Sequence, residues 1–318
     1  MKTLQFVDAR GLRLAVAKDD DAPVRDVTSV LSWAGSLVDL IELSRVMGTG
    51  LPSLLRQLYD QSTEEITADL VEGWVDSMGR RVGVGLPVQA TEVWAAGVTY
   101  RRSREARQEE SGDGEAIYRR VYDAERPELF LKDSQGIRSV PTGVPIGVRG
   151  DSVWSVPEPE IALVLDSTGA IVGVTLANDV TARDLEAENP LYLPQAKIFS
   201  ASCAYGPCML VVEGGADSIP DMEIRLEILD AEGATRFAAE TSTSMMQRTY
   251  VELVDWLRRY NVFRDGTLLL TGTGIVPPGT MALTQGDRVA ISSPTIGRLV
   301  NPVDILSSST KQTAEVAR

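Results

Sequence analysis

The sequence of 318 residues contains no histidine. A chain without an imidazole side chain cannot form a Ser-His-Asp or Cys-His catalytic pair, and it cannot build a zinc site with histidine ligands. It also lacks the side chain that most often moves protons near neutral pH. Catalysis by this chain must therefore rest on carboxylates, on Lys, Tyr, Ser, Thr and Arg, and on a hard metal ion.

Cysteine and long apolar runs are scarce as well. The two cysteines, Cys203 and Cys208, have neither the C-x-x-C spacing of redox sites nor the spacing of half a zinc site, so we interpret them as reduced structural thiols. No run approaches the roughly 18 apolar residues of a membrane-spanning helix, and the first residues do not form a secretory signal. We therefore expect a cytoplasmic, unprocessed protein without a membrane partner.

Basic residues are fewer than acidic ones. The chain has 31 Lys and Arg and 45 Asp and Glu, which gives a net charge of −14. A polyanion repels phosphate backbones and anionic lipids, so we expect no nucleic-acid partner. The length is sufficient for two ordinary domains.

The pattern of apolar residues and turn residues along the chain changes near residue 88. Residues 3–17 predict a hairpin, residues 29–58 predict helices with a break at Gly48–Pro52, and residues 67–75 predict a third helix. These segments predict a small N-terminal α+β domain over residues 1–88.

Short apolar runs separated by turns dominate the rest of the chain. They predict a mostly β catalytic domain over residues 89–304, so the fold class is α+β / mostly β. One helix is expected over residues 244–260, with its apolar side chains on one face. Residues 305–318 are expected to form a loose C-terminal tail. The highly charged segment 101–128 is either a solvated surface loop or an active-site lid.

The most informative segment is Glu158-Pro-Glu160, followed by an apolar run. Residues two apart on a strand point to the same face, so both carboxylates lie together. A turn centred near residue 168 would make antiparallel partners add up to about 336, which brings Asp179 beside Glu158. Three oxygen ligands without His or Cys suit Mg²⁺, or alternatively Mn²⁺ or Ca²⁺. The alternative interpretation is that Glu158 and Glu160 form an ordinary polar strand edge and that Asp179 caps a turn.

Two further stretches carry chemistry. Lys197 stands in a sequence apolar enough to favour loss of its proton, so it is either a proton-transfer group or a counter-ion of the three carboxylates. The run Thr271–Gly274 resembles a dinucleotide loop, but the prolines that follow cannot open a helix. We interpret it as a tight loop that offers backbone N–H groups and the Thr273 hydroxyl to an anion.

Taken together, these motifs resemble the fumarylacetoacetate hydrolase family over residues 93 to 302. The resemblance rests on Glu158-x-Glu160, residues 178–184, Ala196-Lys197, residues 205–207, residues 271–273, Gly286-Asp287, Gly297 and Asn301. It implies the family's β-rich catalytic domain and Mg²⁺ held by Glu158, Glu160 and Asp179. It also implies a small-molecule 2-oxo acid substrate and a homodimer or homotetramer.

The departure from the family pattern is equally informative. Family hydrolases carry a His and a Glu after a Tyr and use them to activate water, whereas this chain has Ser103 and Ala106 at those positions. With residues 95–100 and 125–132, the chain resembles a branch that dehydrates 2-keto-3-deoxy sugar acids. The resemblance implies a Mg²⁺-dependent hydro-lyase of pentose oxidation, converting 2-keto-3-deoxy-D-arabinonate or D-xylonate to 2,5-dioxopentanoate.

The resemblance also implies roles for individual residues. Lys197 or Glu128 would remove the C3 proton, and Glu128 would protonate the departing C4 hydroxyl. The expected substrate-binding residues are Arg101, Arg102, Ser103, Arg183 and Thr273, because a guanidinium grips a carboxylate with two hydrogen bonds. Which arginine does so is left open by the sequence.

Two other functions are compatible with the same residues. One is a C–C bond hydrolase or decarboxylase of acylpyruvates or oxaloacetate, which would share the metal site. The other is a catalytically inactive protein that binds sugar acids.

Overall fold

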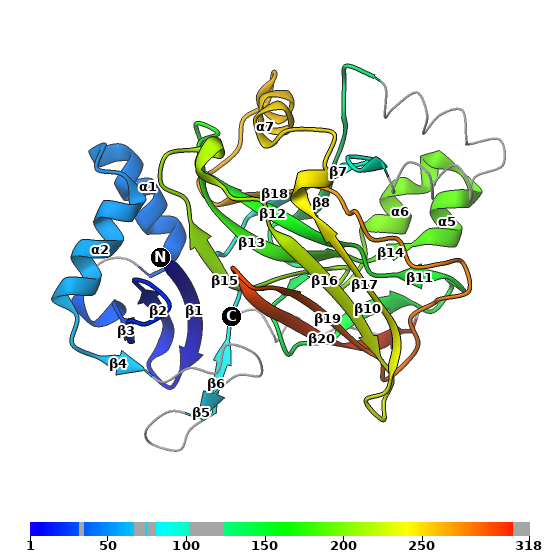
Figure 1. Cartoon of the computed structure of the whole chain (residues 1–318), viewed down its shortest axis with the longest axis horizontal. Helices are drawn as coiled ribbons and strands as arrows, with labels where there is room; N and C mark the ends of the chain where they lie inside the picture. The colour runs from blue at the N-terminus through cyan, green and yellow to red at the C-terminus, as the bar shows by residue number, and fades with distance from the viewer. Residues whose placement is uncertain (32–34, 67–73, 76–80, 102–123, 308–318) are drawn as a thin grey trace.

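The computed structural model describes most of the chain, with the two termini and the order of the elements shown in Figure 1. The described residues are 1–31, 35–66, 74–75, 81–101 and 124–307. Arg102, Ser103 and most of the expected lid lie outside them, as do residues 308–318 of the expected tail.

The N-terminal segment folds as a small α+β unit. Strands β1 (Lys2–Asp8) and β2 (Gly11–Ala17) form the predicted hairpin, and β3 (Val24–Asp26) and β4 (Glu65–Ile66) continue it. Helices α1 (Leu37–Met47) and α2 (Leu51–Gln61) lie beside these strands (Figure 1). The predicted break between them is confirmed: Gly48 and Gly50 have φ of 67° and 72°, which a residue with a side chain rarely adopts.

The central part of the larger sheet contains strands from both halves of the chain. They are β7 (Glu92–Gly97), β8 (Glu128–Ser134), β12 (Pro159–Leu165), β13 (Ile171–Asp179), β15 (Cys203–Val211) and β18 (Thr267–Leu270). The order is β4-β3-β2-β1-β15-β13-β12-β18-β7-β8, and β5 (Trp74–Val75), β6 (Arg81–Val84) and β9 (Ser139–Val140) pair off this path. Because β1 pairs with β15, the N-terminal strands extend the same sheet. The domain division at residue 88 stays a prediction.

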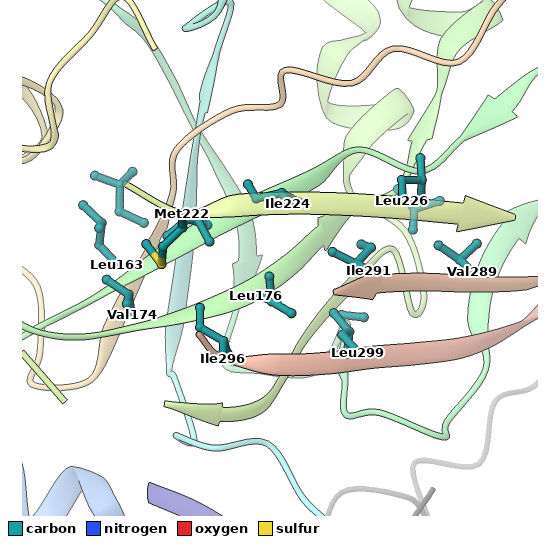
Figure 2. Close-up of a cluster of buried hydrophobic side chains, with 14 of the residues drawn as sticks. Leu163, Val174, Leu176, Met222, Ile224, Leu226, Val289, Ile291, Ile296 and Leu299 are labelled. Carbon is teal, nitrogen blue, oxygen red and sulfur yellow. The ribbon is translucent and has the colours of Figure 1, made fainter. Parts of the chain in front are cut away.

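A second sheet of five strands packs against the first. Its strands are β10 (Ile146–Arg149), β16 (Glu223–Leu229), β17 (Thr235–Ser242), β19 (Arg288–Ser293) and β20 (Gly297–Leu306), in the order β10-β20-β19-β16-β17. Figure 2 shows side chains of the two sheets meeting in one core, among them Leu163, Val174, Leu176, Ile224, Leu226, Ile291 and Leu299. The mostly β architecture predicted for residues 89–304 is therefore observed.

Strand β12 is buried on both faces, which explains its uninterrupted apolar sequence. Ile161, Leu163 and Leu165 belong to the core between the two sheets, whereas Ala162 and Val164 belong to a second core that also contains buried residues of α1 and α2. Strands covered on both sides have near-continuous apolar runs. Glu160 thus lies on a strand whose residues are all buried.

The remaining elements are short. They are the paired strands β11 (Ser155–Val156) and β14 (Thr181–Ala182), the helices α5 (Arg183–Glu188), α6 (Leu193–Lys197) and α7 (Tyr250–Arg258), and 3-10 turns at Thr28–Val30, Pro190–Tyr192, Ala216–Ser218 and Thr243–Met245. None of the helices in the described part of the chain combines the length and apolar character that crossing a membrane requires.

Three predicted elements differ from the structure. The helix expected from residue 244 begins at Tyr250, because Thr249 caps it by accepting the N–H of Glu252 and Met246 pairs with Tyr100 instead. Trp74 and Val75, expected in a helix, form β5 by pairing with β6. The expected loose tail begins later than residue 305, because β20 continues to Leu306 through its parallel pairing with β10.

Candidate active site

The hairpin of β12 and β13 places the three predicted metal ligands together. Pro159 pairs with Asn178 and Glu160 with Ala177, so partner numbers add up to 337, one more than predicted. Glu158 consequently lies opposite Asp179 itself, and the Asp179 N–H donates to the Glu158 carbonyl at 3.0 Å. The turn is held by Asp166, whose side chain accepts the N–H groups of Thr168 and Ala170.

Glu158, Glu160 and Asp179 form a buried carboxylate cluster. One oxygen of each lies within 4.8 Å of the others, and the exposed fraction of each residue is at most 3%. Burial, followed by the neighbouring Asp179 and Glu158 carboxylates, raises the pKa of Glu160 well above its ordinary value. The Gly272 N–H opposes this by donating to Glu160 Oε2 at 2.5 Å. Such an all-oxygen cluster fits a hard divalent cation, which would offset the repulsion between the carboxylates.

Lys197 lies at the centre of the cluster. Its Nζ is 2.6 Å from Glu158 Oε2, 2.8 Å from Asp179 Oδ2 and 2.7 Å from Thr181 Oγ1. The ammonium of Lys197 thus bridges two of the three predicted metal ligands, which is the counter-ion arrangement that the sequence analysis weighed against proton transfer.

Lys132 is a second buried lysine at this site, and no role was predicted for it from the sequence. Its Nζ is 2.5 Å from Asp179 Oδ1 and 3.0 Å from the Val180 carbonyl, and it also donates to the Lys197 carbonyl. Lys132 has no partner in β7, because Asp133 pairs with Val93 and Leu131 with Trp94. The side chain of Lys132, at this β-bulge, is fully buried. Its position four residues after Glu128 on one strand was the signal available in the sequence.

Arg183 and Glu186 complete the buried charges. Arg183 Nη2 lies 3.0 Å from Glu158 Oε1, and Nη1 lies 3.7 Å from Glu186 Oε2. Both residues lie on α5, directly after β14, and each is at most 2% exposed. Arg183 was expected to bind substrate, and in this structure its guanidinium pairs with a predicted metal ligand. Glu186 was not anticipated.

The buried charges of the site leave one negative charge in excess among the described residues. Four acids stand against three bases: Glu158, Glu160, Asp179 and Glu186 against Lys132, Arg183 and Lys197. Buried charges are stable only when they are paired. A divalent cation at the carboxylate cluster would offset this excess, which is a second indication that the residues present fit such an ion.

Glu128 lies at the start of β8, opposite Gly97 in β7. A methyl group on Gly97 would overlap the Glu128 carboxylate, so this carboxylate rests directly over the glycine. Glu128 and Gly97 line the same cavity as the carboxylate cluster, together with Ala96, Val98, Phe130, Arg183, Glu186, Lys197, Gly272 and Thr273. The structure therefore brings the two predicted catalytic residues, Glu128 and Lys197, to one cavity.

The other predicted substrate contacts are distributed differently. Thr273 is buried in the cavity wall, where its hydroxyl donates to the Ile275 carbonyl at 3.1 Å. The anion that its loop contacts is the Glu160 carboxylate, through the Gly272 N–H. Arg101 is exposed and is not among the residues that line the cavity. Arg102 and Ser103 lie outside the described residues.

Comparison with curated proteins gives two strong matches. The chain is 41% identical over 284 residues to a Haloferax volcanii protein named "Probable 2-keto-3-deoxyxylonate dehydratase", covering 89% of this chain and 93% of that one. It is 45% identical over 220 residues to the 2-dehydro-3-deoxy-D-arabinonate dehydratase of Saccharolobus solfataricus, covering 68% and 73%.

Comparisons with solved structures and with family models agree with these two matches. The structure of 2-keto-3-deoxy-D-arabinonate dehydratase complexed with magnesium and 2,5-dioxopentanoate matches with a TM-score of 0.76 and 32% identity, over 96% of this chain and 99% of that one. The model of the fumarylacetoacetate hydrolase C-terminal domain matches residues 93–304. This chain belongs to the fumarylacetoacetate hydrolase family.

Proposed function

We propose that this protein is a Mg²⁺-dependent dehydratase that converts a 2-keto-3-deoxypentonate to 2,5-dioxopentanoate. The observation that carries this proposal is the single cavity shared by Glu128 and the buried cluster of Glu158, Glu160 and Asp179. The two relatives above 40% identity are named as dehydratases of such acids, and the similar solved structure holds magnesium and 2,5-dioxopentanoate.

Glu158, Glu160 and Asp179 would hold the Mg²⁺ ion, with Mn²⁺ and Ca²⁺ as further ions of the same ligand preference. When bound, the cation would supply Lewis-acid polarisation of the 2-oxo group of the substrate. Lys132 and Lys197 each contact a different oxygen of Asp179, so they fix the orientation of that carboxylate.

Glu128 is the proton-transfer residue in this proposal. It takes the proton from C3 and gives a proton to the C4 hydroxyl, which leaves as water and creates a C3=C4 double bond. Loss of a proton from C5 and gain of one at C3 then give the C4=C5 enol, which gains a proton at C4, loses its hydroxyl proton and becomes the C5 aldehyde of the product. Lys197 suits this role less well, because it already donates to Glu158, Asp179 and Thr181. An amine that removes a proton needs an unoccupied lone pair.

Thr273 and Arg183 remain the proposed substrate contacts, since both line the cavity. Arg183 would share its guanidinium between Glu158 and the substrate. The proposed roles of Arg101, Arg102 and Ser103 rest on the sequence resemblance. A homodimer or homotetramer and a cytoplasmic location likewise stay predictions.

The proposal is tested by following two substrates in one tube by proton NMR. Purified protein with Mg²⁺ is mixed with 2-keto-3-deoxy-D-pentonate and acetylpyruvate. We expect 2,5-dioxopentanoate to form and acetylpyruvate to persist, because the His and Glu of the family hydrolases are absent. Cleavage of acetylpyruvate would favour the hydrolase alternative, and binding without any product would favour the inactive sugar-acid-binding protein.

Replacing Gly97 with alanine is expected to lower kcat by about 100-fold while the protein stays folded. The new methyl group would displace the Glu128 carboxylate, and a misplacement of about 1 Å can cost about that factor. Stability should change little, because the overlapping atoms are the far end of a flexible side chain. Steady-state kinetics and thermal unfolding measure the two effects.

Gly83→Ala is the matched control, because it is also a strand glycine and a Cβ there meets nothing within 4 Å. It should retain the wild-type kcat. Wild-type turnover in Gly97→Ala would contradict the placement of Glu128 over this glycine as a requirement for catalysis.

A further inference from the structure

Thr181 is a buried polar residue of the site to which the reaction assigns no role. It lies on β14, where it pairs with Val156 of β11, and its exposed fraction is 0%. Its hydroxyl donates to the Asp179 carbonyl at 3.0 Å and accepts from Lys197 Nζ at 2.7 Å. Because the hydroxyl hydrogen is directed at the Asp179 carbonyl, the lone pairs of the oxygen face Lys197.

The three acceptors around the Lys197 ammonium are not equivalent. Glu158 and Asp179 belong to the carboxylate cluster, so a cation bound there would compete with Lys197 for their electron density. Thr181 is neutral and is not part of that cluster. It is therefore the acceptor that holds the ammonium equally well with and without a cation.

The other end of the Lys197 side chain is fixed as well. Lys132 donates to the main-chain carbonyl of Lys197 and to that of Val180, the residue just before Thr181. Lys132 thus ties the backbone of Lys197 to the segment that carries Thr181. With the Lys197 carbonyl held by Lys132 and Ser202, Thr181 is the acceptor of the ammonium for which a cation on Glu158 and Asp179 would not compete.

We propose that Thr181 is a positioning residue, which holds the Lys197 ammonium between Glu158 Oε2 and Asp179 Oδ2 during the reaction. The expected change in kcat rests on the proposed dehydratase function. Its structural part concerns the Mg²⁺-loaded protein and can be tested without any substrate.

The test replaces Thr181 with valine, which has nearly the same shape and lacks the hydroxyl. Thr181→Ser restores the hydroxyl. Thr175→Val is the matched control, because Thr175 is equally buried and its hydroxyl also donates to a carbonyl, that of Cys208, away from the site. Thr181→Cys, which differs from Thr181→Ser in one atom, takes the place of Thr181→Val if the latter does not fold.

Two measurements are made on the full chain. The first is NMR of lysine side chains labelled with ¹⁵N in the Mg²⁺-saturated protein without substrate, where a buried, hydrogen-bonded ammonium exchanges its hydrogens slowly, and Lys197→Met identifies the signal of Lys197. The second is kcat and KM with saturating Mg²⁺. We expect Thr181→Val to lose the slowly exchanging signal and to lower kcat on the order of tenfold with little change in KM. Thr181→Ser and Thr175→Val should resemble the wild type.

A retained Lys197 signal in Thr181→Val would overturn the proposal, as would a kcat loss of the same size in Thr175→Val. If the wild type does not dehydrate the substrate, the proposed function fails while the NMR comparison still decides the role of Thr181.

Discussion

Replacing Glu128 with glutamine is expected to lower kcat about a thousandfold. General acid–base catalysis contributes between about a hundredfold and ten-thousandfold, and here one carboxylate would both remove the C3 proton and protonate the leaving hydroxyl. Glutamine keeps the shape over Gly97 but can do neither. The affinity for Mg²⁺ should stay close to that of the wild type, because Glu128 is not part of the carboxylate cluster.

Single-turnover kinetics and calorimetric titration with Mg²⁺ separate the two effects. Glu92→Gln is a suitable control, because Glu92 lies on the strand that pairs with β8 and does not line the cavity. A variant Glu128→Gln with turnover near that of the wild type would return the role of base to Lys197 or to another group.

Replacing Glu160 with glutamine is expected to abolish tight Mg²⁺ binding and, at the same time, to stabilise the metal-free protein at neutral pH. The carboxylate is buried beside Glu158 and Asp179, so its ionised form is unfavourable without a cation. Glutamine removes that charge and keeps an oxygen that can accept the Gly272 N–H. One substitution should therefore change metal affinity and metal-free stability in opposite directions.

The pH dependence of stability provides a direct measurement. Folding raises the pKa of Glu160 above its ordinary value of 4.5, so the protonated carboxyl is favoured in the folded protein. This contribution to stability is fully present below the unfolded pKa and is lost as the pH rises through the raised pKa. Thermal unfolding of the metal-free wild type should show this loss from about pH 4.5 upwards, and Glu160→Gln should lack it.

Glu186→Gln is the matched control for the metal, because Glu186 is equally buried and lines the same cavity but is not in the cluster. It should retain Mg²⁺ affinity. If Glu160→Gln bound Mg²⁺ as tightly as the wild type, the assignment of the three ligands would be wrong.

The arrangement of the carboxylate cluster could be predicted because it depends on local rules. The alternation of side chains along a strand places Glu158 and Glu160 on one face, and the turn after Asp166 determines where the chain returns. The estimate of the pairing differed by one residue, because a bulge between Val164 and Leu165 adds one residue to the turn region. The predicted cluster was still correct, because the observed pairing places Asp179 directly opposite Glu158.

Helix ends were predicted less well than strands. The helix expected from residue 244 has apolar residues at helical spacing, but Met246 pairs with Tyr100 and the capping residue Thr249 lies five residues after the expected start. A contact between residues so distant in sequence leaves no periodic signal. Local periodicity therefore predicted that a helix exists, and tertiary pairing decided where it begins.

By itself, the sequence of this protein determined which chemistry is available and which residues carry the cluster. The absence of histidine excluded imidazole chemistry, and the hairpin pattern placed three carboxylates in an apolar setting. Only the tertiary structure decided which groups surround these carboxylates. Lys132 contacts Asp179 from β8, and the Lys197 ammonium is shared between two carboxylates and Thr181. Gly97 leaves room for the Glu128 side chain. The physical reason is that the charge and hydrogen-bond pairing of buried groups depends on distances between segments far apart in the chain, which short-range patterns do not encode.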